Sequence, residues 1–238
     1  MKNLQVHIQV SPELYLKNPE SSELGSKIVA TSVEMINALG FEAFTFKKLG
    51  QKIGSPESSI YRYFESKHTL LIYLTSWYWN WMEYKLVFGM ANINSPSHKL
   101  KEAIKILTQP TTVDNSISHI DEVLLNKIII TESVKTYYTK DVDSENEKGY
   151  FRAYKQVVRR VSDIVLELNP KFEFPHMLIS TIIEGAHHQR YFAEHLPSLT
   201  DVNQRKDNIS NFYTQMVFKV IAEWGARFYI IILRFSTY

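Results

Sequence analysis

The chain has 238 residues, of which 45% are hydrophobic and 22% are charged, a balance that is typical of a folded globular protein and not of a disordered one. The formal net charge is +2, so any surface that binds a nucleic acid must be a local cluster of cations. Because the chain has no cysteine, disulfides, thiolate nucleophiles and cysteine-based zinc or iron–sulfur sites are excluded.

Residues 1–16 lack an apolar core and a small-residue cleavage site, so they do not resemble a signal peptide. The apolar run Phe228–Leu233 is far shorter than the roughly 20 residues that a membrane helix needs. These features predict a cytoplasmic protein with no membrane partner. The role of the apolar segment 225–238 stays open.

The amino-terminal part of the chain predicts an arm followed by a helix. Residues 1–17 are expected to form an irregular arm, although apolar and polar residues alternate over 6–10 as in a short strand. Asn18-Pro19-Glu20 joins an N-cap residue to a proline and an acid, and this combination predicts a helix start. Apolar residues at helical spacing continue to Leu39, and Gly40 is the expected C-cap.

Two short helices are expected next. Thr45 is placed to cap a helix over 46–53, which Gly54 ends, and Ser55-Pro56 begins a second helix that runs to about Phe64. A gap of about three residues around Gly54 is typical of a helix-turn-helix. Helices this short need a shared core, for which the sequence offers Leu39, Phe46, Leu49, Ile53, Ile60, Phe64 and Leu70.

The rest of the chain predicts further helices and no strand. Lys67 begins a long helix that reaches about Met90, and the cluster of helix-breaking residues at 92–97 follows it. Apolar periodicity then predicts helices near residues 97–108, 117–138, 145–168, 175–195 and 203–225. The expected class is all-α.

Cations gather around the two short helices. Between Thr45 and Leu70 the local net charge is +3, against +2 for the whole chain. The cations are Lys47, Lys48, Lys52, Arg62 and Lys67. Phosphate contacts require such a cluster together with hydroxyl donors and the free amides at helix amino ends. Thr45 and Lys67 each lie at the start of a predicted helix. An ordinary solvated helix face is the alternative explanation for the lysines.

A specific run of residues gives this region an identity. Residues 59–71 read SIYRYFESKHTLL, after an aromatic residue that follows a helix-ending glycine at Gly40-Phe41. The run resembles the TetR family of bacterial transcriptional regulators, which usually shows Thr-Leu-Tyr-x-Tyr-Phe-x-Ser-Lys-x-x-Leu-Leu there. The resemblance spans residues 41–71 without a gap, and the first helix extends it back to about Ser22.

The resemblance implies a fold, a division into domains and a mechanism. It implies that the arm of residues 1–17 is followed by a helix-turn-helix DNA-binding head (residues 18–71, with the motif at about 45–65) and a helical ligand-binding and dimerisation body (residues 72–238). A homodimer, formed by helices near 175–195 and 203–225, would sit on a palindromic operator. A small-molecule inducer bound in the body would release it, so the expected function is that of a repressor.

The resemblance also assigns roles within the head. Thr45, Tyr61, Tyr63 and Lys67 fall at phosphate-contacting positions, and Lys47 and Lys48 add charge beside them. The expected base-reading residues on the second short helix are Ser55, Glu57, Ser58, Ser59 and Arg62. The sequence departs from the usual family pattern at Ser55, Pro56, Glu57 and Ser58, and these departures put the operator sequence in doubt more than DNA binding itself.

The body offers candidates for a ligand pocket. Aromatic side chains share one face of the long helix, where they could form a core or the wall of a pocket for an apolar or cationic molecule. The pocket candidates are Tyr73, Trp77, Trp81, Tyr84, His187 and His188. Glu184 and His187 are spaced like a diiron element, but that chemistry needs a second copy and further glutamate ligands in a helical bundle, and no such set stands out, so no metal or other cofactor is expected.

Other functions find no positive signal. The sequence has no glycine-rich phosphate loop, no His-Glu-x-x-His and no Gly-x-Ser-x-Gly, so an enzyme is not expected. A helical ligand-binding or adaptor protein whose head no longer binds DNA stays open as the alternative.

Overall fold

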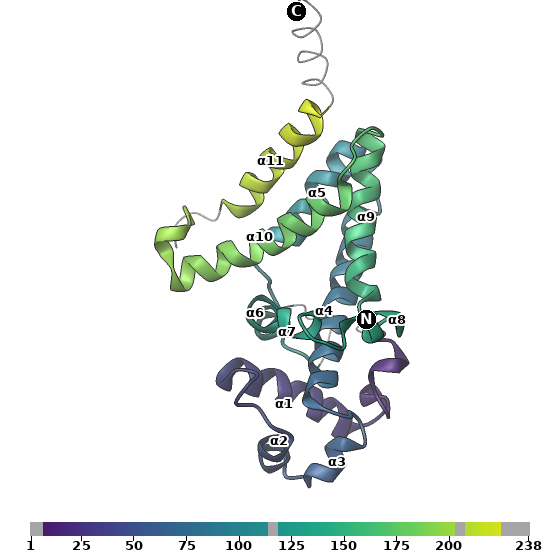
Figure 1. The fold of residues 1–238 in the computed structure, drawn as a ribbon, viewed down its shortest axis with the longest axis vertical. Coiled ribbons are helices and arrows are strands. Elements are labelled where there is room, and N and C mark those ends of the chain that lie inside the picture. The colour runs from purple at the N-terminus through teal and green to yellow at the C-terminus, as the bar shows by residue number, and fades with distance from the viewer. Residues whose placement is uncertain (1–6, 114–118, 203–207, 225–238) are drawn as a thin grey trace, which may run out of the picture. The chain divides into compact units, whose positions relative to one another are not determined.

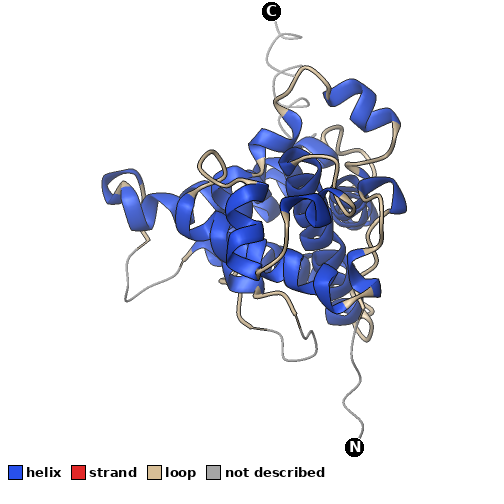
Figure 2. Ribbon diagram, turned by 90° about the horizontal axis from the view of Figure 1, so that it is seen from below, coloured by secondary structure: helices blue, strands red, loops and turns tan. Residues whose placement is uncertain are grey.

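The computed structural model describes residues 7–113, 119–202 and 208–224, and within these ranges every regular element is a helix (Figure 2). The 3-10 turns are η1 (Pro12–Leu14), η2 (Pro19–Ser21) and η3 (Pro197–Leu199). The α-helices are α1 (Glu23–Leu39), α2 (Phe46–Ile53), α3 (Glu57–Tyr61), α4 (Lys67–Met90), α5 (Pro96–Thr108), α6 (Glu122–Glu132), α7 (Val134–Tyr137), α8 (Val142–Glu147), α9 (Arg152–Leu168), α10 (Pro175–His195) and α11 (Ile209–Glu223). The predicted all-α class is confirmed.

The chain divides into two compact units, which are described separately. The first contains residues 1–81 together with 111–154, and the second contains 82–110 and 155–238. The first unit therefore holds α1–α3, the beginning of α4 and the later helices α6–α8 (Figure 1). None of the described helices is both long enough and apolar enough to span a bilayer.

The first helix begins later than the sequence predicts. Asn18 accepts a hydrogen bond from the Glu20 amide (2.9 Å) and caps only the turn η2, because Ser22 behind it is extended, with φ −157°. The Ser22 hydroxyl then caps α1 by accepting from the Gly25 amide (3.1 Å). Gly40 ends α1 as expected, with φ +77°.

The predicted caps of α2 are confirmed. The Thr45 hydroxyl accepts from the Lys48 amide (3.2 Å), and Gly54 adopts the left-handed conformation, with φ +71°. The apolar side chains expected to share a core are buried, except for Leu39, which is 47% exposed. Phe44, which the sequence did not single out, is fully buried with them.

Two predicted helices are each broken in two. The segment expected to run from 117 to 138 is interrupted at Ser133, whose carbonyl accepts the Thr136 hydroxyl (2.6 Å). The segment expected from 145 to 168 is interrupted at Gly149, which has φ +81°. The predicted helices 97–108 and 175–195 are confirmed as α5 and α10, whereas parts of 203–225 and all of 225–238 lie outside the described residues.

The second unit is held by polar contacts and one close helix crossing. The Thr108 hydroxyl at the end of α5 shares a hydrogen bond with Ser210 on α11 (2.8 Å), and Arg190 on α10 donates to the Thr108 carbonyl. A Cβ at Gly185 would overlap the Tyr213 hydroxyl oxygen, so a larger residue there would require the Tyr213 side chain to shift where α10 and α11 cross.

The turn between α2 and α3 gives the first testable prediction. A Cβ at Gly50 would lie 2.6 Å from the Ser55 carbonyl oxygen, which belongs to the rigid turn. We expect Gly50→Ala to lower the free energy of unfolding by about 1–3 kcal/mol, as overpacking does. Urea unfolding followed by circular dichroism measures this change.

Gly54→Asn is the matched control, because no atom lies within 4 Å of its Cβ position and asparagine tolerates the left-handed conformation. The free energy of unfolding of Gly54→Asn should fall by less than about 1 kcal/mol. Equal losses at the two glycines would contradict the steric explanation.

Candidate nucleic-acid interface

One surface of the head collects the exposed cations and hydroxyls of α2 and α3. The exposed residues from the predicted set are Thr45, Lys47, Lys48, Ser58, Tyr61 and Arg62, and the half-exposed ones are Ser55, Glu57 and Ser59. We call these nine residues the α2–α3 surface. Lys52 is exposed too and adds a cation near the end of α2. This surface can offer charge-assisted hydrogen bonds to a polyanion.

The amino end of α2 is only partly satisfied by the protein. The Thr45 hydroxyl accepts from the Lys48 amide, and the Lys48 ammonium donates to the Ala43 carbonyl (2.7 Å) at the same end. Because the first turn of a helix leaves several amides without carbonyl partners, an anion can be bound there.

Tyr61 lies at the end of α3 with a fixed ring. Its ring meets the buried Phe46 ring edge to face at a centroid distance of 5.1 Å, while 47% of the residue stays exposed. This arrangement limits the freedom of the side chain before any partner binds, which lowers the entropy cost of a contact.

Tyr63 does not belong to the α2–α3 surface, contrary to the sequence-based expectation. It is 1% exposed, and its hydroxyl shares a hydrogen bond with Ser22 (2.8 Å). The Lys17 ammonium lies 5.1 Å from the ring centroid, and the Leu16 amide donates to the Tyr63 carbonyl (2.8 Å). The hydrogen bond from Ser22 lowers the pKa of Tyr63. Tyr63 therefore ties the arm and α1 to the end of α3.

Lys67 is also used inside the head. Its ammonium donates to the carbonyls of Phe41 (3.0 Å), Glu42 (3.1 Å) and Phe44 (3.3 Å), and it lies 4.7 Å from the Phe41 ring centroid. Three bonds occupy all three donors of an ammonium. The expected phosphate-contacting role of Lys67 has no geometric support, because the side chain holds the loop between α1 and α2.

Lys27 is a further head residue that the sequence did not indicate. It extends from α1 and donates to the Ile53 carbonyl (3.0 Å), the last residue of α2. A cation at this end of a helix satisfies a free carbonyl and favours the helix dipole. Spacing along α1 carries no signal for this contact, since α2 is brought to Lys27 only by the folded chain.

The ligand-pocket candidates fall in both compact units. Tyr73, Trp77 and Trp81 belong to the first unit and are each 1% exposed. The two tryptophan rings are stacked at 6.4 Å. The Tyr73 hydroxyl donates to Glu20 (3.4 Å), and burial raises the pKa of Tyr73. A cavity of about 400 Å³ is lined by the arm, Asn18, Glu20 and Tyr73, so it contains one of the six candidates.

Tyr84, His187 and His188 belong to the second unit. Tyr84 contacts the exposed Phe88 (4.5 Å between centroids), and the exposed His188 stacks on Phe192 (5.9 Å). His187 is buried, and burial lowers its pKa to about 4. Over residues 7–113, 119–202 and 208–224 no three histidine, aspartate or glutamate side chains converge as a metal site.

The head matches a known family of regulators. The family model described as "Bacterial regulatory proteins, tetR family" matches residues 28–74, which span most of α1, all of α2 and α3, and the first part of α4. The chain has a tetR-family head. The predicted resemblance is confirmed over these residues, which carry the helix-turn-helix of this family of DNA-binding regulators.

Solved structures share the fold of most of the chain at low identity. AibR, in complex with isovaleryl coenzyme A and operator DNA, aligns with a TM-score of 0.55 and 12% identity over 79% of this chain and 95% of AibR. The fatty acid degradation regulator FadR from Bacillus halodurans aligns with a TM-score of 0.56 and 13% identity, over 90% of this chain and 96% of FadR. The superantigen PfiT aligns with a TM-score of 0.54 and 12% identity, over 85% of this chain and 97% of PfiT.

At these identities the structural alignments establish the fold and not the ligand or the partner, as the inclusion of a superantigen illustrates. No curated protein matches the chain. The tetR-family head, with its helical body, is the predicted architecture and is confirmed.

The hydroxyl of Tyr63 gives the second prediction. We expect Tyr63→Phe to lower the free energy of unfolding by about 0.5–1.5 kcal/mol, because the hydrogen bond between Ser22 and the phenol is lost and the Ser22 hydroxyl keeps only the bond from the Gly25 amide. Tyr61→Phe, which changes an exposed tyrosine on the same turn, should leave stability unchanged. Thermal unfolding of both variants measures the difference, and an unaffected Tyr63→Phe variant would show that the Ser22 contact contributes nothing.

The buried imidazole of His187 gives the third prediction. Its pKa of about 4 lies below the ordinary value of 6.5, so the unfolded chain takes up the proton first as the pH falls. Stability should therefore drop between pH 6.5 and pH 4, by about 1–3 kcal/mol from this residue. Unfolding by urea across this range should show a shallower drop for His187→Gln. The exposed neighbour His188→Gln should keep the wild-type slope, and identical slopes for all three proteins would contradict the assignment.

Proposed function

We propose that the chain is a repressor that binds a two-fold-symmetric DNA site as a homodimer and leaves it when a small molecule binds in the body. The observation that carries this proposal is the α2–α3 surface, where exposed cations and hydroxyls lie on the helix-turn-helix of a tetR-family head. The domain division proposed with it is an arm (1–17), a head (18–71) and a body (72–238).

Electrostatics supports a duplex as the partner. Lys47, Lys48 and Arg62 are exposed on elements that also present hydroxyls, and phosphates are recognised by this combination. Ser58 and Arg62 belong to α3 and its C-cap, the element that enters the major groove in helix-turn-helix proteins. We assign phosphate contacts to Thr45, Lys47, Lys48 and Tyr61, and base contacts to Ser55, Glu57, Ser58, Ser59 and Arg62.

A homodimer is favoured by exposed apolar side chains on the last two described α-helices. Met177 and Tyr191 on α10 are 66% and 36% exposed, and Phe212 on α11 is 57% exposed. Ile179, Ile182 and Ile183 of α10 are buried inside the second unit and are unavailable to a partner. A two-fold contact would cover the exposed side chains.

The inducer we propose is a small apolar or cationic molecule, in keeping with the aromatic side chains of the body. AibR, which shares the fold, was solved with a coenzyme A thioester, and this supports ligand control in proteins of this shape. We further propose a cytoplasmic protein without enzymatic activity, because the function assigned to the head requires access to the chromosome and no catalysis.

The fourth prediction tests this function directly. Duplexes selected from a random-sequence library by the purified full chain should share a two-fold-symmetric site. Affinity for that site should fall steeply with salt. Lys47→Gln should weaken binding to the selected and to an unrelated duplex by a similar factor and should reduce the salt slope by about 1, whereas Arg62→Gln should change the preferred sequence.

Lys105→Gln is the control, because Lys105 is an exposed lysine of α5 that pairs with Glu102 (3.2 Å). It should bind both duplexes like the wild type. If no duplex is enriched even at low salt, the chain is not a DNA-binding repressor. Enrichment of a single asymmetric half-site would argue against the homodimer.

A further inference from the structure

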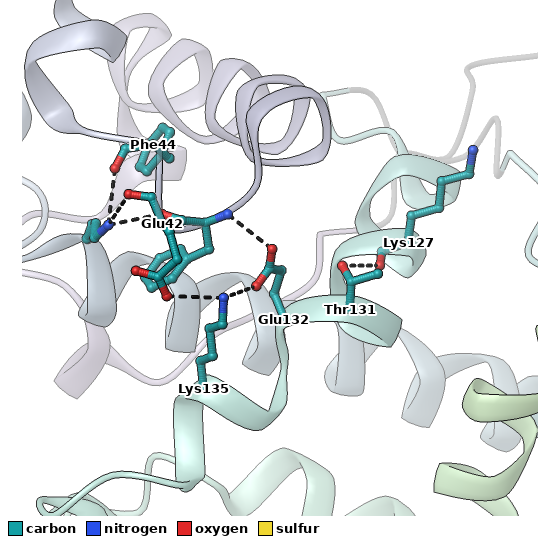
Figure 3. Close-up of polar contacts among 8 residues, drawn as sticks. Glu42, Phe44, Lys127, Thr131, Glu132 and Lys135 are labelled. Atoms are coloured by element: carbon teal, nitrogen blue, oxygen red, sulfur yellow. Dashed lines mark hydrogen bonds and ion pairs between the residues drawn. The ribbon is translucent and has the colours of Figure 1, made fainter. Parts of the chain in front are cut away.

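The loop between α1 and α2 (residues 40–45, the α1–α2 loop) is held from outside the helix-turn-helix. Lys67 binds three of its carbonyls from within the head, as described above. A second set of contacts comes from α6 and α7, which lie in the same compact unit but outside the family match at 28–74 (Figure 3).

Glu132, the last residue of α6, accepts a backbone hydrogen bond from the loop. Its Oε1 accepts from the Phe41 amide (3.1 Å), and the side chain is 12% exposed. The same oxygen lies 3.7 Å from the Cβ position at Gly40, so the carboxylate sits directly against the end of α1. A hydrogen bond to a charged and largely buried acceptor is among the stronger kinds.

Lys135 of α7 joins this carboxylate to the loop. Its ammonium lies 2.7 Å from Glu132 Oε2 and 3.1 Å from Glu42 Oε1, bridging the two acids (Figure 3). It also lies 5.9 Å from the centroid of the Phe41 ring. The hydrogen bond to Glu132 raises the pKa of Lys135, so its ammonium stays protonated at neutral pH. Glu42 is 79% exposed, so most of the interaction resides in Glu132 and Lys135.

The loop leads directly into the α2–α3 surface. It ends at Thr45, which caps α2, and it contains the fully buried Phe44. Where the loop lies therefore decides where α2 begins and where Lys47 and Lys48 point. A loop that moved freely would have to be ordered each time the surface met a duplex, at a cost in binding free energy.

We propose that Glu132 and Lys135 are positioning residues for the DNA-binding surface, which they order by holding the α1–α2 loop from α6 and α7. This inference rests on the proposed function. Glu132 acts through the Phe41 amide, and Lys135 acts through Glu132 and through Glu42 of the loop. The interface therefore depends on a segment far along the chain from the helix-turn-helix.

The test compares three variants with one control in the full-length chain. Glu132→Ala removes the acceptor and the charge, Glu132→Gln keeps an acceptor for the Phe41 amide but loses the charge, and Lys135→Ala removes the bridge. Thr131→Ala is the control, since Thr131 is exposed on the same helix and bonds only the Lys127 carbonyl of its own turn (2.9 Å) (Figure 3).

Two readouts are measured on each protein. Hydrogen exchange of the Phe41 amide reports the contact itself, and affinity for the selected duplex reports the surface. We expect Glu132→Ala to speed Phe41 exchange by roughly tenfold or more and to weaken DNA binding by roughly three- to thirtyfold, the usual range for residues that modulate a site they do not touch. Glu132→Gln and Lys135→Ala should show smaller changes in the same direction, and Thr131→Ala should show none.

Faster Phe41 exchange with unchanged DNA affinity would overturn this inference and leave the proposed function intact. Tighter DNA binding by Glu132→Ala would also overturn it, because the contact would then hold a loop position unsuited to DNA. If the wild-type chain binds no duplex, the proposed function fails and this inference fails with it, even if Phe41 exchange responds as expected.

Discussion

A helix of five residues gains too little from its own hydrogen bonds to persist in water, and the helix-turn-helix of this protein contains such a helix. The position of α3 therefore depends on apolar burial supplied by its neighbours. Ile60 and Phe64 are fully buried, and the Phe46 ring of α2 packs against Tyr61. The position of the α2–α3 surface therefore depends on the apolar side chains buried on the opposite side of these helices.

Polar contacts complete what burial begins. Lys27, Lys67 and Glu132 each bind a backbone group at a helix end or in the loop between helices, where carbonyls and amides lack partners. Apart from Lys48, whose ammonium binds the Ala43 carbonyl, the charged side chains that hold the head together are distinct from those on the α2–α3 surface. Counting cations in the sequence cannot separate these two roles.

The sequence was informative wherever the signal is local. The Thr45 cap, the Gly54 turn and the limits of α4, α5 and α10 follow from neighbouring residues and are found as predicted. The contacts that Tyr63 and Lys67 make within the head were not predicted, because their partners, Ser22 and the α1–α2 loop, are distant in sequence. The separate helices α6–α9 escaped prediction because Ser133 and Gly149 interrupt runs whose apolar periodicity continues across them.

The contacts of the arm alter where the head should be considered to begin. Leu14 is completely enclosed, Tyr15 meets the Tyr73 ring edge to face at 6.2 Å, and Leu16 donates its amide to Tyr63. A fragment that began at residue 28, where the family match starts, would expose the Tyr73 ring and leave the Tyr63 carbonyl without its hydrogen-bond donor. The folded head is therefore larger than the region that matches the family model, residues 28–74. It extends back at least to the turn at Pro12.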